Sequence, residues 1–149
     1  MGLIDDLGGG RIGVDTAPFI YFIEDVPAFL PALLPLFRAA DRGQMELVTS
    51  AITLLEVLVI PYRSGNRAVA SRYEALLTRS RGVRLVELSR GQLRRGAQLR
   101  AATGCRTPDA LQLTATIDAG CTSFVTNDRR LPTVQNLRII QLGSYASHN

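Results

Sequence analysis

The chain has 149 residues, of which 46% are hydrophobic and 20% charged, and its formal net charge is +4. This length and composition are those of one soluble globular domain. The longest apolar stretch, residues 51–60, is roughly half a membrane span, and the acidic N-terminus excludes a signal peptide. Two cysteines are too few for a disulfide framework or a complete zinc site. We therefore expect a single cytoplasmic domain over residues 1–149, with residues 1–10 as a flexible lead-in and residues 143–149 as a tail.

The positive charge is concentrated in one part of the chain. All 17 basic residues are arginine, and 11 of them lie between Arg63 and Arg106, where there are only two acids. This segment carries +9, whereas the remainder carries −5. Such asymmetry is typical of an electropositive surface beside an acidic centre, and equally of helices with solvated arginine faces.

Strand-like and helix-like segments alternate along the chain. In chain order, they are a strand at residues 11–15, a helix that Thr16 caps, a helix at 28–40, a strand at 47–49, helices at 51–62 and 66–80, a strand at 83–88, helices at 89–103 and 107–120, and strands at 123–126 and 138–142. This alternation predicts a three-layer α/β fold, with a central parallel sheet of about five strands and helices on both faces. Ligands bind such sheets beyond the carboxyl ends of the strands, which is where Asp15 and Asp128 fall.

Few side chains are available for catalysis. The only histidine is the penultimate residue, His148, which argues against a catalytic triad, a cysteine–histidine pair and a two-histidine ribonuclease mechanism. Without lysine there is no phosphate-binding loop of the Walker type, and the glycine pattern at residues 8–13 precedes the first strand instead of following one. Carboxylates, arginines and hydroxyls remain. Carboxylate oxygens suit hard cations such as Mg²⁺ and Mn²⁺, which activate water and neutralise a phosphodiester without a histidine base.

Glu56 lies in the most apolar segment of the chain. On a helix, its neighbours three and four residues away are Ile52, Thr53, Val59 and Ile60. No rotation of the helix therefore places Glu56 on a polar face. Because a buried carboxylate without a partner is costly, Glu56 is expected either to bind a metal or to pair with an arginine at the edge of the helix.

Three aspartates occupy strand ends or helix starts. Asp15 ends the first strand and can cap the helix that follows. Asp109 lies at the start of a helix, where the helix dipole favours a negative charge. Asp128 follows a strand and can serve as a turn residue. Each aspartate has a local explanation of this kind, but together with Glu56 they form a set that predicts a metal site.

Four short motifs carry these acids. They are Val14-Asp15-Thr16, Ser50-Ala51-Ile52-Thr53-Leu54-Leu55-Glu56-Val57, Pro108-Asp109-Ala110-Leu111 and Phe124-Val125-Thr126-Asn127-Asp128-Arg129-Arg130-Leu131. In this order and at these separations, they resemble the PIN-domain ribonucleases, in particular the VapC-type toxins of bacterial toxin–antitoxin pairs. The resemblance covers residues 12–142.

The resemblance implies a PIN-like fold and a set of site residues. Asp15, Glu56, Asp109 and Asp128 would hold one or two Mg²⁺ or Mn²⁺ ions, with the Thr126 hydroxyl supporting the site. It further implies an endoribonuclease that hydrolyses phosphodiester bonds of single-stranded or loop RNA, by analogy tRNA or rRNA, and so inhibits translation. A homodimer and a cognate antitoxin protein are the implied partners, without a membrane.

If the function is of this kind, we expect the arginine-rich segment between Arg63 and Arg106, with Arg94 and Arg95 in it, to hold phosphates that flank the cleaved bond.

The sequence departs from the family pattern at two points. Ala17 and Pro18 follow the first motif, where the family often has Asn or Ser, and Arg129 and Arg130 stand where a further acid is sometimes found. Two other functions use the same fold or the same carboxylate chemistry: a catalytically silent RNA-binding or scaffold module, and a structure-specific, metal-dependent DNA nuclease. A phosphatase with an aspartyl nucleophile is set aside, because the position two residues after Asp15 is Ala17.

Overall fold

The computed structural model describes residues 2–147, so His148 lies outside the described residues. Its strands are β1 (Gly10–Val14), β2 (Met45–Ser50), β3 (Val83–Val86), β4 (Ser123–Thr126) and β5 (Arg138–Gln141). Its helices are α1 (Leu3–Leu7), α2 (Thr16–Ile23), α3 (Leu30–Asp41), α4 (Ile52–Ser64), α5 (Arg67–Arg79), α6 (Arg90–Thr103), α7 (Thr107–Asp118) and the 3₁₀ helix η1 (Leu142–Tyr145). Within the described part of the chain, no helix has the length and apolar character needed to cross a membrane.

The five strands form one all-parallel sheet in the order β3-β2-β1-β4-β5. After β1 the chain adds β2 and β3 on one side, then returns to place β4 and β5 on the other. Gly13 of β1 lies in register with Val48 of β2 and Phe124 of β4. The prediction of a parallel, five-stranded α/β sheet is confirmed. The carboxyl ends of β1 and β4 meet where the order reverses, the position at which open parallel sheets bind ligands.

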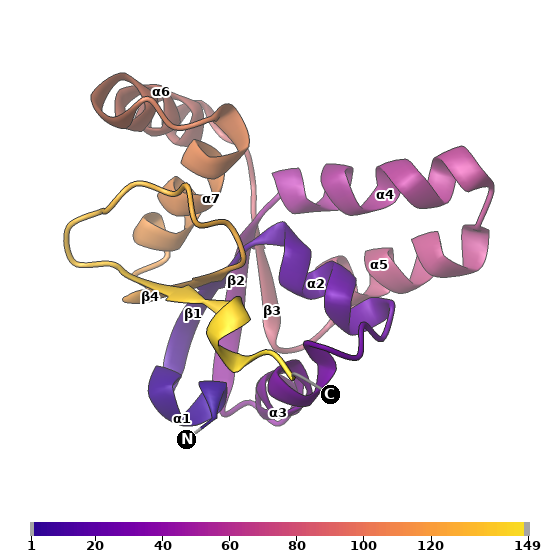
Figure 1. Cartoon of the computed structure of the whole chain (residues 1–149). Coiled ribbons are helices and arrows are strands. Elements are labelled where there is room, and N and C mark those ends of the chain that lie inside the picture. The colour runs from indigo at the N-terminus through magenta and orange to yellow at the C-terminus, as the bar shows by residue number, and fades with distance from the viewer. Residues whose placement is uncertain (1, 148–149) are drawn as a thin grey trace.

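Side chains of the sheet alternate between two apolar layers. Ile12, Val14 and Leu47 belong to the layer packed under α2, α3 and α5. Phe124 packs instead with Leu113 of α7 on the opposite face. Figure 1 shows α2, α3, α4 and α5 on one side of the sheet, with α6 and α7 on the other. The helices therefore cover both faces, as predicted.

Gly13 allows α7 to approach the centre of the sheet. A Cβ at this position would lie 2.4 Å from side-chain atoms of Thr116 and 2.9 Å from the ring of Phe124. Close packing, and not an unusual backbone conformation, therefore requires the glycine. Because α7 carries Asp109 in its first turn, this contact helps to set the position of that carboxylate relative to β1.

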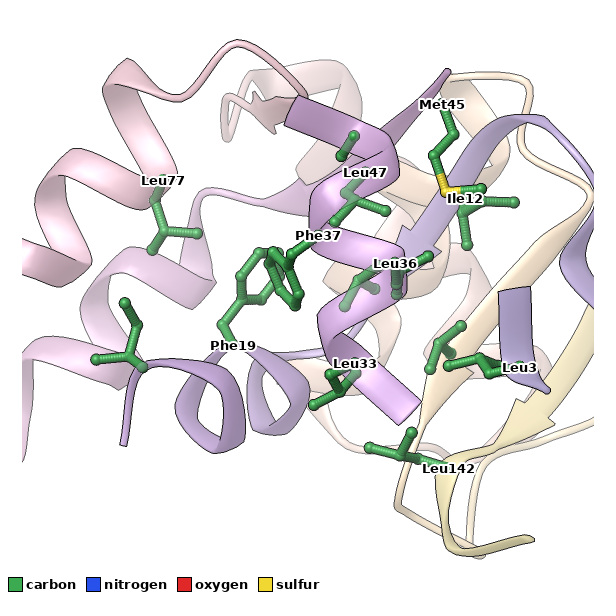
Figure 2. Packing of buried hydrophobic residues seen from close by; sticks show 14 of the residues in the cluster. Leu3, Ile12, Phe19, Leu33, Leu36, Phe37, Met45, Leu47, Leu77 and Leu142 are labelled. Atoms are coloured by element: carbon green, nitrogen blue, oxygen red, sulfur yellow. The ribbon is translucent and has the colours of Figure 1, made fainter. Parts of the chain in front are cut away.

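The larger core holds α2 against α3 (Figure 2). The ring of Phe37 stacks on Phe22 with centroids 3.9 Å apart, and it meets Phe19 edge-on at 5.7 Å. Aromatic pairs of this kind stabilise a core beyond the burial of their surface. Since α2 begins directly after Asp15, this packing also holds the start of α2 at the carboxyl edge of the sheet.

The flexible lead-in predicted for residues 1–10 is wrong over α1 and the start of β1. Leu3 and Leu7 are buried in the larger core, and Figure 2 shows Leu3 and Leu142 together in that cluster. Two leucines four residues apart lie on one side of a single helical turn, which gives this short helix a face to bury.

The predicted tail at residues 143–149 is also folded as far as the structure describes it. Tyr145 of η1 packs against the larger core, and its hydroxyl donates to the carboxylate of Asp6. The N–H of Ser147 donates to the carbonyl of Ala28 at 2.7 Å. The two ends of the described chain are therefore held to the same core.

Candidate active site

Four carboxylates line one open pocket at the carboxyl edge of the sheet. The pocket has a volume of about 610 Å³ and is walled by the start of α2, the second turn of α4, the start of α7 and the loop after β4. The residues that line it are Asp15, Thr16, Ala17, Ile20, Tyr21, Glu56, Arg106, Pro108, Asp109, Asn127, Asp128, Arg129 and Arg130. The fold thus brings all four acids singled out in the sequence to one place.

Asp15 is the N-cap of α2. Its Oδ1 accepts the backbone N–H of Thr16 at 2.8 Å, and its Oδ2 accepts the hydroxyl of Thr126 at 2.7 Å. The capping role suggested for Asp15 is confirmed, and the prediction that Thr16 is the cap is wrong by one residue, because Thr16 is the first residue of the helix and donates its free N–H to Asp15. Capping and lining the pocket are compatible roles, since the cap holds the carboxylate in one orientation.

Glu56 reaches the pocket from α4, where its Oε1 accepts the hydroxyl of Thr16 at 2.7 Å. Its side chain is only half-buried, and its apolar neighbours Leu55, Val59 and Ile60 are 60%, 41% and 69% exposed. The expectation of a carboxylate enclosed by apolar side chains is therefore wrong. Figure 1 shows the reason, because α4 and α5 project together from the sheet. Among the described residues, no arginine forms a salt bridge with Glu56.

Asp109 and Asp128 are joined by one guanidinium group. Arg106, the residue before α7, donates from Nε to Oδ2 of Asp109 at 3.0 Å and from Nη2 to Oδ2 of Asp128 at 2.8 Å. Oδ1 of Asp128 accepts the backbone N–H of Arg130 at 2.9 Å and its Nε at 3.1 Å. The turn predicted at Asp128 is present, and both carboxylates carry an arginine counter-charge.

A buried amide links the elements that hold Asp15 and Glu56. The Nε2 of Gln112 donates to the hydroxyls of Thr53 at 2.6 Å and Thr16 at 3.2 Å. Its Oε1 accepts the N–H of Ser50 at 3.1 Å, and the whole side chain is 2% exposed. Because buried polar groups need their partners, this network fixes α2, α4 and α7 relative to one another.

The surroundings of Asp15 disfavour its ionised form. Burial raises the pKa of Asp15 above its ordinary value, and this effect exceeds the lowering by the hydrogen bonds from Thr126 and Thr16. The negative charges of Asp109 and Glu56 raise the pKa further. The three carboxylates therefore repel one another around Asp15.

At the rim of the pocket, the surroundings of Asp128 favour its ionised form. Partial burial of Asp128 acts to raise its pKa, but the hydrogen bonds and charge of Arg130 and the charge of Arg106 outweigh burial. The pKa of Asp128 consequently lies below its ordinary value. Arg106 and Arg130 thus favour the ionised form of Asp128, at a place where both arginines also meet solvent.

The donors in the pocket suit a hard divalent cation. They are carboxylate, hydroxyl and amide oxygens, and neither histidine nor cysteine occurs among the described lining residues. A cation would also relieve the repulsion around Asp15. Within the described part of the chain, no three Asp, Glu, Cys or His side chains already converge as a coordinating group. Arg106 supplies positive charge beside both Asp109 and Asp128, and Arg130 supplies a second positive charge beside Asp128.

Three arginines line the pocket: Arg106, Arg129 and Arg130. The segment expected to contact phosphates ran from Arg63 to Arg106, and of its described members only the last lines this pocket. Arg129 and Arg130 directly follow Asp128 in the sequence, a signal that could have assigned them to the site. The bridge made by Arg106 depends on the separation of α7 from the loop after β4, which no local pattern shows.

Arg95 was expected to contact phosphates together with Arg94, but it is engaged elsewhere. Its guanidinium forms an ion pair with Asp118 at the end of α7. This pair ties α6 to α7 on the face of the sheet where those helices pack. Arg94, one residue earlier, is exposed on α6 and forms no salt bridge within the described part of the chain.

The sequence matches the PIN domain family over residues 12–137, which is most of its length. The chain therefore belongs to the PIN domain family, and the family predicted from its four motifs is confirmed. A search of curated proteins finds no match.

Solved structures with the same fold include toxin–antitoxin proteins. VapBC2 from Rickettsia felis, bound to a DNA fragment from its promoter, is 17% identical with a TM-score of 0.67. The matched region covers 89% of this chain and 98% of the neighbour's chain. VapC20 from Mycobacterium tuberculosis, a toxin that cleaves the sarcin–ricin loop, is 15% identical with a TM-score of 0.66, covering 81% and 92%. DNA-bound VapBC from Salmonella typhimurium is 18% identical with a TM-score of 0.59, covering 91% and 99%. At these identities the likeness establishes the fold.

Proposed function

We propose that this chain is a metal-dependent endoribonuclease of the VapC type, which hydrolyses phosphodiester bonds in single-stranded or loop RNA. The observation that carries the proposal is the pocket in which Asp15, Glu56, Asp109 and Asp128 meet. Membership of a family of nucleases supports it. The described lining residues include no histidine, so a mechanism based on imidazole acid–base catalysis has no group there to use.

The four carboxylates would hold Mg²⁺ or Mn²⁺, which when bound supplies Lewis acidity at a phosphodiester and a more acidic water. Thr126 keeps Oδ2 of Asp15 in a fixed orientation through its hydrogen bond. Thr16 does the same for Oε1 of Glu56. Such prior orientation of the charged groups lowers the cost of assembling them when the substrate arrives.

The rim of the pocket favours a polyanionic substrate. Arg129 lines the pocket and forms no salt bridge with an acid among residues 2–147, so its charge is available to a phosphate. Guanidinium groups bind phosphate oxygens through paired hydrogen bonds. An open pocket suits unpaired nucleotides, whose backbone and bases are accessible in a way that those of a duplex are not.

The structural neighbours extend the proposal to partners. VapC20 is a toxin that cleaves the sarcin–ricin loop, and the neighbours from Rickettsia felis, Salmonella typhimurium and Klebsiella pneumoniae are toxin–antitoxin complexes. We therefore include in the proposal a loop of tRNA or rRNA as substrate, a cognate antitoxin as partner, and a homodimer in the cytoplasm.

Cleavage of matched oligonucleotides tests the proposal. A labelled RNA stem-loop and a DNA of the same sequence are incubated with the protein in Mg²⁺, in Mn²⁺ and in EDTA. We expect RNA cleavage with either cation and none in EDTA. Asp15→Asn should abolish cleavage, whereas Asp118→Asn should retain it, because Asp118 pairs with Arg95 outside the pocket.

The alternative functions give different results in the same experiment. A DNA nuclease would cleave the DNA and spare the RNA. A catalytically silent RNA-binding module would slow the migration of the RNA in a gel and would cleave neither the RNA nor the DNA. Cleavage that continues undiminished in EDTA would overturn the role of the metal.

A further inference from the structure

Arg106 places one positive charge between two carboxylates of the pocket. Besides the contacts of 3.0 Å to Asp109 and 2.8 Å to Asp128, its Nη2 lies 3.3 Å from Oδ1 of Asp109. The guanidinium thus spans both oxygens of Asp109 and reaches across to the loop after β4. Its own side chain is 57% exposed, whereas that of Asp109 is 11% exposed.

The four carboxylates fall into two pairs according to what holds them. Asp15 and Glu56 accept hydrogen bonds from hydroxyls and a backbone N–H. Asp109 accepts, within the described part of the chain, only from Arg106. Asp128 accepts from Arg106 and Arg130. Half of the proposed ligand set is therefore occupied by guanidinium groups.

Building on the proposed function, we propose that Arg106 is an exchangeable counter-cation. It neutralises Asp109 and Asp128 while the divalent cation is absent, and it leaves Asp109 when the cation binds. Released, it donates to a phosphate of the RNA at the same pocket. The guanidinium fork that fits a carboxylate also fits a phosphate, so no new chemistry is needed for the second role.

The exposure of Arg106 makes the exchange possible. A charge pair with one solvent-exposed partner contributes little net stability, so the contact can be broken at low cost. The carboxylate remains in place when the arginine leaves, because Asp109 is built into the first turn of α7 and buried there. Because the same Asp109 oxygens cannot serve both cations fully, the arginine competes with the metal.

Titration calorimetry with Mn²⁺ alone, on the metal-free protein without RNA, tests the competition. We expect Arg106→Gln to bind Mn²⁺ about fivefold more tightly than the wild type, the size expected from loss of one exposed pair. Arg129→Gln is the matched control, because it removes an equal charge from the same pocket without a carboxylate partner within the described residues. Its affinity should change by less than twofold. Arg106→Lys, which keeps the charge but loses the fork, should lie between the wild type and Arg106→Gln.

Equal or weaker Mn²⁺ binding by Arg106→Gln and Arg106→Lys would overturn the proposal, as would equal tightening by Arg129→Gln. The proposal is also overturned if the wild type and both Arg106 variants bind no Mn²⁺. If Arg106→Gln fails to fold, the Lys variant decides.

For the phosphate role, kcat/KM on RNA at saturating Mn²⁺ should fall about tenfold in Arg106→Gln despite its tighter metal binding; an unchanged value would overturn that role. If the wild type does not cleave RNA, the proposed function is contradicted. The Mn²⁺ affinities from calorimetry still test whether Arg106 competes with the metal.

Discussion

The hydroxyl of Thr126 donates to Oδ2 of Asp15 at 2.7 Å, and the same oxygen of Thr126 accepts the backbone N–H of Asp128 at 3.0 Å. One side chain at the end of β4 therefore orients the carboxylate of Asp15 and also holds the backbone of Asp128. The first hydrogen bond joins β4 to the residue after β1, so no local pattern predicts it, whereas the second joins residues two apart in the sequence. A substitution of Thr126 can therefore change the orientation of Asp15 without changing the net charge of the pocket.

Replacing Thr126 with Val should disturb the pocket without changing its net charge. The hydroxyl is lost at constant shape, which should cost about 1–3 kcal/mol of unfolding free energy because a buried acceptor and an N–H lose their partner. We expect RNA cleavage to fall by about tenfold or more as Asp15 loses its orientation. Urea melts and cleavage rates measure the two effects, and Thr126→Ser should restore most of both. Normal cleavage by the Val variant would contradict the orienting role.

The pH dependence of the metal-free protein should report on Asp15. Its pKa is raised in the folded state above its ordinary value of 3.8, so the folded state binds this proton more tightly than the unfolded state. The contribution of Asp15 to stability is thus fully present below pH 3.8 and is lost as the pH rises through the folded-state pKa. Relative to Asp15→Asn, the wild type should gain stability on acidification through this window. Parallel pH profiles of the two proteins in EDTA would contradict the shift.

Glu56 offers a test of metal binding that does not depend on cleavage. Because Glu56 is half-buried and the amide of Gln still accepts from Thr16, Glu56→Gln should change metal-free stability by less than about 0.5 kcal/mol. Mn²⁺ at a hundred times its Kd should stabilise the wild type by about 2.7 kcal/mol and the variant much less. Glu46→Gln is the control, since Glu46 pairs with Arg11 away from the pocket. A full Mn²⁺ response in Glu56→Gln would remove this residue from the ligand set.

Gln112 should couple stability to the geometry of the pocket. Changing it to Leu leaves the Ser50 N–H and three threonine hydroxyls without their amide partner, at a cost of about 2–3 kcal/mol. Mn²⁺ affinity should fall as well, because Thr16 no longer holds Glu56 in a fixed place. Gln92→Leu removes an equally buried amide that contacts Asp118 outside the pocket, so it should destabilise the fold while leaving Mn²⁺ affinity unchanged.

The salt dependence of RNA binding should locate the phosphate contacts. For single-stranded nucleic acid, each phosphate contact contributes about 0.7 to the slope of log affinity against log salt concentration. Arg129→Ala should therefore reduce the slope by about 0.7, whereas Arg94→Ala on α6 should leave it unchanged. Equal reductions in the two variants would return the contact surface to the broad arginine-rich segment expected from the sequence.

Most of the fold could be predicted from the sequence because its elements are long enough to show their periodicity. The five strands and the helices on both faces were found to within a few residues at their ends. The helix α1 was missed because its five residues lie beside glycines, which locally indicate a flexible segment, and only contact with the core gives Leu3 and Leu7 a buried position.

The four carboxylates that line the pocket were singled out for partly wrong reasons. Glu56 was singled out as a carboxylate enclosed in an apolar helix, but exposure of that helix depends on how α4 and α5 project from the sheet. The pairing of Arg106 with Asp109 and Asp128 and the amide network of Gln112 depend on distances between elements far apart in the sequence. Local patterns contain no information on such distances.

The order of the strands has a consequence for the ribosome that makes this chain. The central strand β1 is the first strand to be synthesised. One of its two neighbours in the sheet, β4, is only the fourth strand along the chain, so one edge of β1 stays unpaired until β4 has been made. Until Thr126 and Asp128 have emerged, Asp15 lacks its orienting hydroxyl and Arg106 lacks its second carboxylate. A nascent chain that ends before β4 therefore lacks part of the set of residues that lines the pocket. The strand order thus makes completion of the pocket depend on the synthesis of β4 and the loop after it.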